Sequence, residues 1–162
     1  MSFLPPHIRS LDLPDADATA DLGRRLGSVL ASGDVVLLDG PIGAGKTHFS
    51  RTVIQDRMAQ SGQVEDVPSP TFTLVQVYET DPEIWHADLY RLHHPDDVIE
   101  LGLDVAFDEA ICLVEWPDRL GDLTPKTALQ LAFRNSADGE SRQVTISGDA
   151  EWAARLQKIG LA

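Results

Sequence analysis

The chain has 162 residues, 43% of them hydrophobic, and its 13 basic and 26 acidic side chains give a net charge of 13 − 26 = −13. This length suits one domain over residues 1–162, large enough to bury about 70% of its unfolded surface. An acidic chain repels phosphate backbones, which argues against independent binding to tRNA or DNA. No apolar stretch is as long as a membrane span, and Met1–Ser10 does not resemble a signal peptide, so we expect a cytoplasmic protein without a membrane partner.

The first quarter of the chain predicts a strand, a helix and a second strand. His7–Leu13 fits a short edge strand, and Asp15 or Asp17 can cap the helix that follows. We expect Gly33 to stop this helix, because glycine is favoured just past a helix end. Val35–Asp39 opens with four apolar residues, as expected of a strand buried on both faces. The apolar stripe of the helix comprises Ala18, Leu22, Leu26, Val29 and Leu30.

The stretch after this strand has the pattern of a phosphate-binding loop, namely glycine, four residues, then glycine, lysine and threonine. Glycines let backbone N–H groups approach phosphates, and the following helix adds its positive N-terminal dipole. Lys46 can reach the β- and γ-phosphates, and the Thr47 hydroxyl can bind magnesium. The strand–loop–helix context favours phosphate binding over an accidental glycine-rich turn. The predicted nucleotide-binding residues are Gly40, Ile42, Gly43, Ala44, Gly45, Lys46, Thr47 and His48.

The rest of the chain alternates predicted strands and helices and then pairs two strands. Strands are expected at Thr73–Glu79, Ile84–Leu89, Ile111–Val114, Thr127–Phe133 and Gln143–Ser147, the last two as a hairpin. Helices are expected after the loop as far as Ser61-Gly62 and at His93–Leu103, Leu103–Ala110 and Asp149–Ile159. In the second of these helices Val98, Leu101 and Ile99 are predicted to face inward. The order of elements predicts an α/β fold, a P-loop NTPase-like three-layer sandwich with a mixed central sheet.

Two acidic residues end predicted strands and are candidates for chemistry. Glu115 closes an apolar strand, at the carboxyl end of the sheet, where open α/β folds bind their ligands. A carboxylate there can hold magnesium opposite Thr47. Asp88 also ends a strand and can act on the metal or on the attacking water. The alternative for each is a solvated acid at a strand end.

Three further features allow a functional and a structural interpretation. Thr71 follows the stiff Ser69-Pro70 pair, so its hydroxyl can sense a γ-phosphate or simply belong to a surface turn. His93-His94 and the acids that follow fit a solvated helix start better than a metal cluster. Cys112 lies in an apolar run, which predicts a buried, inert thiol, and a lone cysteine excludes an internal disulfide.

Four motifs follow one another along the chain. They are Gly43-Ala44-Gly45-Lys46-Thr47, Ser69-Pro70-Thr71-Phe72-Thr73-Leu74-Val75, His86-x-Asp88-Leu89-Tyr90-Arg91-Leu92 and Val114-Glu115-Trp116-Pro117. In residues, order and spacing this series resembles the bacterial TsaE (YjeE) family, and the resemblance covers nearly the whole chain. Any one motif is weak evidence beyond nucleotide binding, but the four together are specific.

The resemblance implies a small P-loop ATPase that binds ATP or ADP with Mg²⁺. It further implies a role in the N6-threonylcarbamoyl modification of adenosine 37 in tRNAs that read codons beginning with A. In that family the ATPase does not transfer the threonylcarbamoyl group. It binds the partner proteins TsaB and TsaD, uses ATP hydrolysis to support their repeated turnover, and meets tRNA only indirectly.

Carried onto matching positions, the resemblance also implies residue roles. Lys46 and its loop hold the phosphates, while Thr47 and Glu115 hold magnesium. Asp88 positions the water or supports the metal, so that Lys46, Asp88 and Glu115 form the implied catalytic set. The implied switch and partner-face residues are Ser69, Thr71 and Trp116, although a tryptophan beside the metal acid is more often packing than chemistry.

The sequence departs from the family pattern near the loop. Pro41-Ile42 stands where the family usually has an acid and a leucine, and His48 replaces a small or β-branched residue. Neither change removes a phosphate contact, because those contacts come from backbone N–H groups and Lys46. The adenine site is weakly marked, with Asp15–Thr19 and Arg142 as its candidates.

Two alternatives to the accessory ATPase stay open. In a small-molecule kinase, Asp88 would be the general base and Arg91 would hold an anionic substrate. Against it, no lid-like segment gathers arginines, and Arg51 and Arg57 lie on the helix after the loop. The other alternative is a non-catalytic switch that binds ADP or ATP and gates a partner. We expect the TsaB–TsaD assembly to cover the face that bears Thr71 and Trp116.

Overall fold

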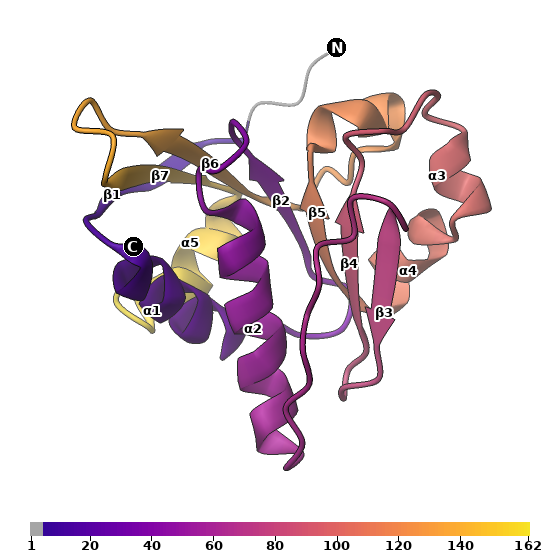
Figure 1. Cartoon of the computed structure of the whole chain (residues 1–162), viewed down its shortest axis with the longest axis horizontal. Coiled ribbons are helices and arrows are strands. Elements are labelled where there is room, and N and C mark those ends of the chain that lie inside the picture. Colours follow the sequence, from indigo (N-terminus) through magenta and orange to yellow (C-terminus); the bar gives the residue numbers. More distant parts are fainter. Residues whose placement is uncertain (1–4) are drawn as a thin grey trace.

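The computed structural model describes residues 5–162, and these residues form one seven-stranded sheet with helices on both faces (Figure 1). The strands are β1 (His7–Leu13), β2 (Val35–Asp39), β3 (Val75–Tyr78), β4 (Ile84–Asp88), β5 (Ile111–Glu115), β6 (Leu129–Asn135) and β7 (Arg142–Ser147). The helices are α1 (Ala16–Gly27), α2 (Lys46–Gln60), α3 (Asp97–Glu100), α4 (Leu103–Glu109), the 3-10 helix η1 (Pro117–Leu123) and α5 (Ala150–Gln157).

The sheet has a parallel centre and antiparallel edges. Its order is β1-β7-β6-β2-β5-β4-β3, and β6, β2, β5 and β4 run parallel to one another. Strands β7 and β1 add antiparallel at one edge, with β1 outermost, and β3 adds antiparallel at the other. Leu38 lies beside Glu115 in register, and Glu115 beside Asp88, so β2, β5 and β4 end at the same edge. This arrangement confirms the predicted mixed α/β fold.

The two faces of β2 are buried under different helices. Val36 and Leu38 belong to the core formed with α1, α2 and α5, whereas Val35 and Leu37 belong to the core formed with α3, α4 and η1. The predicted strand buried on both faces is therefore confirmed. Cys112, beside Val35 in register, is fully buried, and this burial raises the pKa of its thiol to about 12.

Helix α1 begins where predicted but ends differently. The carboxylate of Asp15 accepts a hydrogen bond from the Ala18 amide, a standard N-cap. The helix ends at Gly27, and Gly33 lies in the turn into β2, where its amide donates to the Ala110 carbonyl at 2.9 Å. The prediction that Gly33 stops the helix is wrong. The guanidinium of Arg57 on α2 binds the Gly27 carbonyl instead, so a distant side chain satisfies the helix end.

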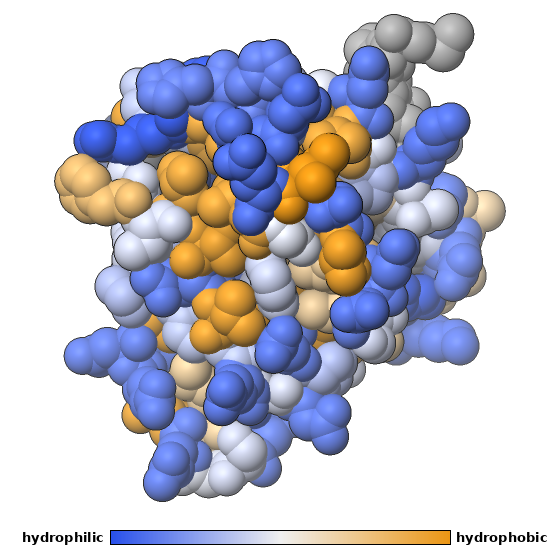
Figure 2. Space-filling view, turned by 90° about the vertical axis from the view of Figure 1, so that its right-hand side faces the viewer, coloured by the Kyte–Doolittle hydropathy of each residue, from blue (hydrophilic) through white to orange (hydrophobic). Residues whose placement is uncertain are grey.

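Helix α3 is shorter than predicted, and its apolar residues do not all face inward. Val98 is fully buried, but Ile99 is 50% exposed, so its predicted inward position is wrong. A helix of about one turn buries only one side, and Gly102 with φ of 82° turns the chain into α4. Val105 on α4 is also exposed. Figure 2 shows the side of the molecule on which α3 and α4 lie, where apolar groups are set among hydrophilic ones.

The helix predicted near the end of the chain is confirmed as α5, although it ends at Gln157 rather than at Ile159. Trp152 and Leu156 of α5 are buried against the sheet. The segment Pro117–Leu123, for which no element was predicted, forms η1 and covers the other face. Within residues 5–162, no helix combines the length and the apolar character that crossing a membrane requires.

Candidate nucleotide-binding site

The predicted phosphate loop connects the carboxyl end of β2 to the first turn of α2. Gly43 and Gly45 have φ of 79° and 105°, which residues with a side chain rarely adopt, and a Cβ on Gly43 would meet nothing within 4 Å. Among the described residues, no acceptor binds the backbone amides of Gly43, Gly45, Lys46 or Thr47. A row of free N–H groups at a helix N-terminus attracts anions.

Lys46 begins α2 and turns its ammonium back along the loop. Its Nζ donates to the Gly40 carbonyl at 2.6 Å and lies 3.6 Å from the centroid of the Trp116 ring. The residue is only 4% exposed. Burial lowers the pKa of this ammonium, and the neighbouring carboxylates of Glu115 and Asp88 act in the opposite direction. The Lys46 ammonium is thus held close to the loop and to both acids.

Glu115 lies directly beneath the first turn of α2 and is bound through both of its carboxylate oxygens. The Thr47 hydroxyl donates to Oε1 at 2.8 Å, and Nε2 of His86 lies 2.7 Å from Oε2. Both Glu115 and His86 are buried, at 2% and 0% exposure. The predicted pair of Thr47 and Glu115 is therefore in direct contact.

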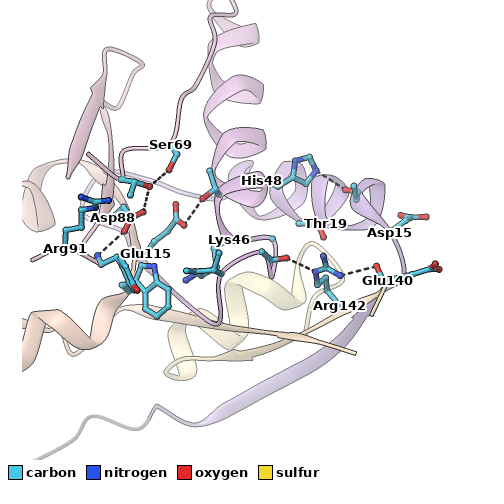
Figure 3. Close-up of a pocket in the computed structure, with 18 residues that line it drawn as sticks. Asp15, Thr19, Lys46, His48, Ser69, Asp88, Arg91, Glu115, Glu140 and Arg142 are labelled. Carbon is cyan, nitrogen blue, oxygen red and sulfur yellow. Dashed lines mark hydrogen bonds between the residues drawn. The ribbon is translucent and has the colours of Figure 1, made fainter. Parts of the chain in front are cut away.

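Asp88 lies beside Glu115 on the adjacent strand and is connected to the segment before β3. The Thr71 hydroxyl donates to Asp88 Oδ2 at 3.1 Å, and the Tyr90 amide donates to Oδ1 at 3.0 Å. The Ser69 hydroxyl lies 2.7 Å from that of Thr71. Ser69, Thr71 and Asp88 thus form a chain of contacts into the site (Figure 3).

Trp116 closes the site on the side of η1. Its backbone is left-handed, with φ of 58°, and its amide donates to the Leu38 carbonyl at 3.3 Å. The ring packs against Tyr90, with centroids 4.8 Å apart, as well as against the Lys46 ammonium. The ring is therefore a wall of the site and a packing residue at once.

These side chains surround a cavity of about 650 Å³. Most of the predicted residues line it, but Gly40 and Ala44 do not. Ala44 is fully buried, and a Cβ on Gly40 would lie 2.6 Å from the Phe133 carbonyl, so these two residues shape the loop from behind. Of the predicted site residues the lining contains Ile42, Gly43, Gly45, Lys46, Thr47, His48, Ser69, Thr71, Asp88, Glu115 and Trp116.

The far end of the cavity is formed by the start of α1 and the start of β7. Asp15, Ala16 and Thr19 line it, as do Glu140 and Arg142, and Arg142 Nε donates to the Gly43 carbonyl at 3.2 Å. Both segments named from the sequence as adenine candidates thus border the same cavity as the loop (Figure 3).

Three residues at the site, Tyr90, Glu140 and His86, were not assigned a role from the sequence, and Arg91 was considered only as an anion-binding residue of a kinase. Tyr90 and Glu140 line the cavity, Arg91 lines it with its guanidinium over the exposed Phe72 ring, and His86 contacts Glu115 from behind. In the sequence, His86 was named only as the first residue of the third motif, with no role attached to it. Its contact with Glu115 depends on the pairing of β4 with β5, which the sequence does not display.

The oxygen ligands at this site suit magnesium bound with a nucleotide. Within the described part of the chain, no three His, Cys, Asp or Glu side chains gather as a metal site. The Thr47 hydroxyl and the Glu115 carboxylate are hard oxygen donors in mutual contact. Magnesium favours such ligands and completes its shell with water and phosphate oxygens, so a two-residue site fits it.

A glycine loop between a buried parallel strand and a helix, with acids at the neighbouring strand ends, defines a P-loop NTPase-like protein. The sequence model of a protein family described as "Threonylcarbamoyl adenosine biosynthesis protein TsaE" matches residues 13–144. The chain belongs to the TsaE family. This confirms the resemblance drawn from the four motifs.

Relatives agree with this assignment, and a solved structure shares the fold. The chain is 33% identical to TsaE of Treponema pallidum over 82% of its own length and 95% of the relative's. It is 34% identical to TsaE of Mycobacterium bovis, covering 83% of this chain and 84% of the relative. The crystal structure of Bacillus subtilis YdiB has the same fold, with a TM-score of 0.78, 22% identity, and coverage of 98% and 97% of the two chains.

Proposed function

We propose that the protein is an ATP-hydrolysing accessory subunit for the threonylcarbamoyl modification of adenosine 37 in tRNA, acting in the cytoplasm on a TsaB–TsaD assembly. The observation that carries the proposal is the 2.8 Å hydrogen bond from Thr47 to Glu115 at the start of α2. It joins the hydroxyl of a phosphate loop to a buried strand-end acid, which is the pair that a magnesium-dependent nucleotide site requires.

In this proposal the loop and its helix bind the phosphates. The free amides of the loop donate to phosphate oxygens, and the Lys46 ammonium supplies the positive charge. Thr47 and Glu115 hold magnesium, which neutralises negative charge on the phosphates when it is bound. Asp15–Thr19 and Arg142 form the base end of the cavity.

Asp88 orients the attacking water or supports the metal from the neighbouring strand. Both of its carboxylate oxygens accept hydrogen bonds, from Thr71 and from the Tyr90 amide, so its orientation is fixed. Because Thr71 also contacts Ser69, a change at the γ-phosphate would reach the segment before β3. Ser69 and Thr71 are the proposed switch.

The partner assembly is proposed to cover the mouth of this cavity. Phe72, next to the switch, is 82% exposed, and Ile42 on the loop is 74% exposed, so apolar side chains flank the mouth. Thr71 and Trp116 line the same cavity as Ile42. The net charge of −13 disfavours direct tRNA contact, which is consistent with partners that hold the tRNA.

The kinase alternative has less support from the side chains. Arg51 and Arg57 bind the carbonyls of Val67 and Gly27, so both arginines are committed to the fold. Among the residues that line the cavity, only Arg91 and Arg142 are arginines, and they come from different segments. Arginines gathered over the phosphates, as a kinase lid supplies, are therefore absent from this lining.

The deciding experiment measures ATP hydrolysis by the protein alone, with TsaB–TsaD, and with tRNA added. We expect slow hydrolysis alone and a higher rate with the assembly, together with support of repeated threonylcarbamoyl transfer. Nucleotide binding without hydrolysis in all three conditions would favour the non-catalytic switch. Faster phosphate transfer to a metabolite than to water would favour the kinase.

A further inference from the structure

His86 is a buried polar residue that lies outside the cavity. It sits on β4, opposite Leu113 in register and two pairs before Asp88 and Glu115. Its exposure is 0%, and it is not among the residues that line the cavity. A nucleotide or metal in the cavity would therefore not touch His86.

The hydrogen bonding of the His86 ring is directed at Glu115 alone. Nε2 lies 2.7 Å from Glu115 Oε2, and Nδ1 has no hydrogen-bond partner among the described residues. An ionised carboxylate only accepts hydrogen bonds, so Nε2 carries the proton and donates it. A buried ring with one unpartnered nitrogen costs free energy in the core. We therefore expect the role of His86 to lie in its hydrogen bond to Glu115.

We infer that His86 is a positioning residue, which holds the Glu115 carboxylate in the orientation that binds magnesium. Thr47 fixes Oε1 from α2, and His86 fixes Oε2 from β4, so two elements together prevent the carboxylate from rotating. Histidine–carboxylate contacts behind a metal ligand act in this way in other proteins, and their loss weakens metal binding about 10- to 100-fold. The inference rests on the proposed magnesium–nucleotide site.

Two substitutions, whose side chains are equally long, separate the effect of the hydrogen bond from the effect of filling the space of the ring. His86→Gln keeps an N–H donor at about the reach of Nε2, whereas His86→Met fills similar space without a donor. The measurement is the affinity for a fluorescent ADP analogue, in EDTA and across a magnesium titration, with the thermal midpoint followed in parallel. If His86→Met does not fold, His86→Asn replaces it, because its amide is too short to reach Glu115.

We expect His86→Met to raise the half-saturating magnesium concentration about tenfold or more, and His86→Gln to stay within about threefold of the wild type. Affinity in EDTA should be the same in all three proteins. The inference would be overturned if the half-saturating magnesium concentration were the same in all three proteins, or if it rose equally in both variants. It would also be overturned if the variants lost as much affinity in EDTA as in magnesium. If the wild type itself shows no magnesium-dependent binding, the proposed site falls, and the inference falls with it.

Discussion

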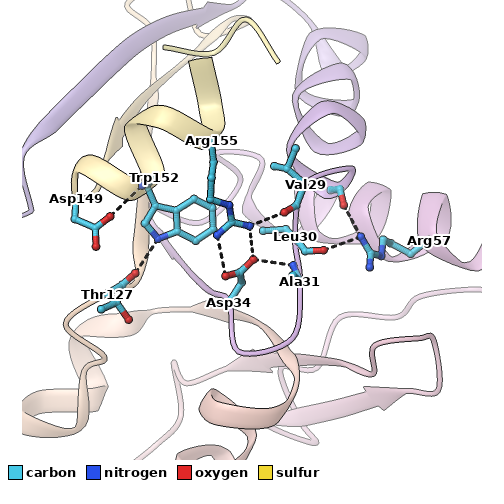
Figure 4. Close-up of polar contacts among 10 residues, drawn as sticks. Val29, Leu30, Ala31, Asp34, Arg57, Thr127, Asp149, Trp152 and Arg155 are labelled. Carbon is cyan, nitrogen blue, oxygen red and sulfur yellow. Dashed lines mark hydrogen bonds and ion pairs between the residues drawn. The ribbon is translucent and has the colours of Figure 1, made fainter. Parts of the chain in front are cut away.

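The two ends of strand β2 are built in opposite ways. At the amino end, Asp34 accepts hydrogen bonds from Arg155 on α5 and from the Ala31 amide, and Arg155 also donates to the Val29 carbonyl (Figure 4). The guanidinium stacks on the Trp152 ring, 4.1 Å from its centroid. Its hydrogen bond to Asp34 raises the pKa of Arg155. This end of the strand is closed by the protein itself.

The carboxyl end of the same strand leaves the amides of the phosphate loop available for a ligand. The loop amides have no acceptor among the described residues, and the Lys46 ammonium is held by one carbonyl and one ring face. Glu115 and Asp88 lie within the same cavity. An ion pair whose hydrogen bonds are all made stabilises a fold, whereas free backbone amides beside a cavity that also holds a cation and two carboxylates prepare a ligand site. The comparison separates structural from functional polar groups.

The largest expected effect is a loss of ATP hydrolysis on substitution at the carboxyl end of β2. Lys46→Ala or Glu115→Ala should lower ATP hydrolysis by about 100-fold or more, because each removes a charge from the phosphate or metal site. The thermal midpoint should change by less than about 5 °C. The measurement is phosphate release with and without TsaB–TsaD, beside a melting curve. Hydrolysis that persists in both variants would place the chemistry elsewhere.

At the amino end of β2, we expect a substitution to lower the stability of the fold and to leave ATP hydrolysis nearly unchanged. Arg155→Met keeps much of the packing on Trp152 but leaves Asp34, 15% exposed, without its charged partner. We expect a loss of about 2 kcal/mol in the free energy of unfolding and hydrolysis within about twofold of the wild type. Urea denaturation measures the first and phosphate release the second. The double variant Arg155→Met with Asp34→Asn is the control and should recover part of the stability.

Two glycines with left-handed backbone, one at each end of the range of crowding, are expected to give smaller effects when replaced by alanine. Gly40 leaves β2 at φ of 139°, and a Cβ there would lie 2.6 Å from the Phe133 carbonyl, whereas Gly139 at φ of 73° has nothing within 4 Å. Gly40→Ala should therefore destabilise by about 2 kcal/mol or more, and Gly139→Ala by about 1 kcal/mol. Urea midpoints measured side by side provide the test. Equal losses would mean that the close approach to β6 does not constrain the loop.

Local patterns predicted the parts of the site that depend on local chemistry. Glycine spacing located the loop, and apolar runs located the central strands. Glu115 was placed at a strand end because a run of apolar residues precedes it, and Asp88 because it falls near the end of the predicted strand Ile84–Leu89. The sequence could not predict contacts that depend on which strands are neighbours. The His86–Glu115 contact requires the pairing of β4 with β5. Likewise, Arg57 of α2 binds the Gly27 carbonyl at the end of α1, a helix that Gly33 was expected to stop.

The smallest expected effect concerns Cys112, which lies beside Val35 near the closed end. Burial raises the pKa of its thiol from 9.0 to about 12, so the folded state disfavours the thiolate. The resulting contribution to stability is complete below pH 9, where the unfolded thiol is also protonated, and is lost as the pH rises towards about 12. We expect a thiol reagent at pH 8 to leave the folded protein unmodified and to react once urea unfolds it. Rapid labelling of the folded protein would show that the sheet opens at this end, and Cys112→Ala is the control for reaction at other groups.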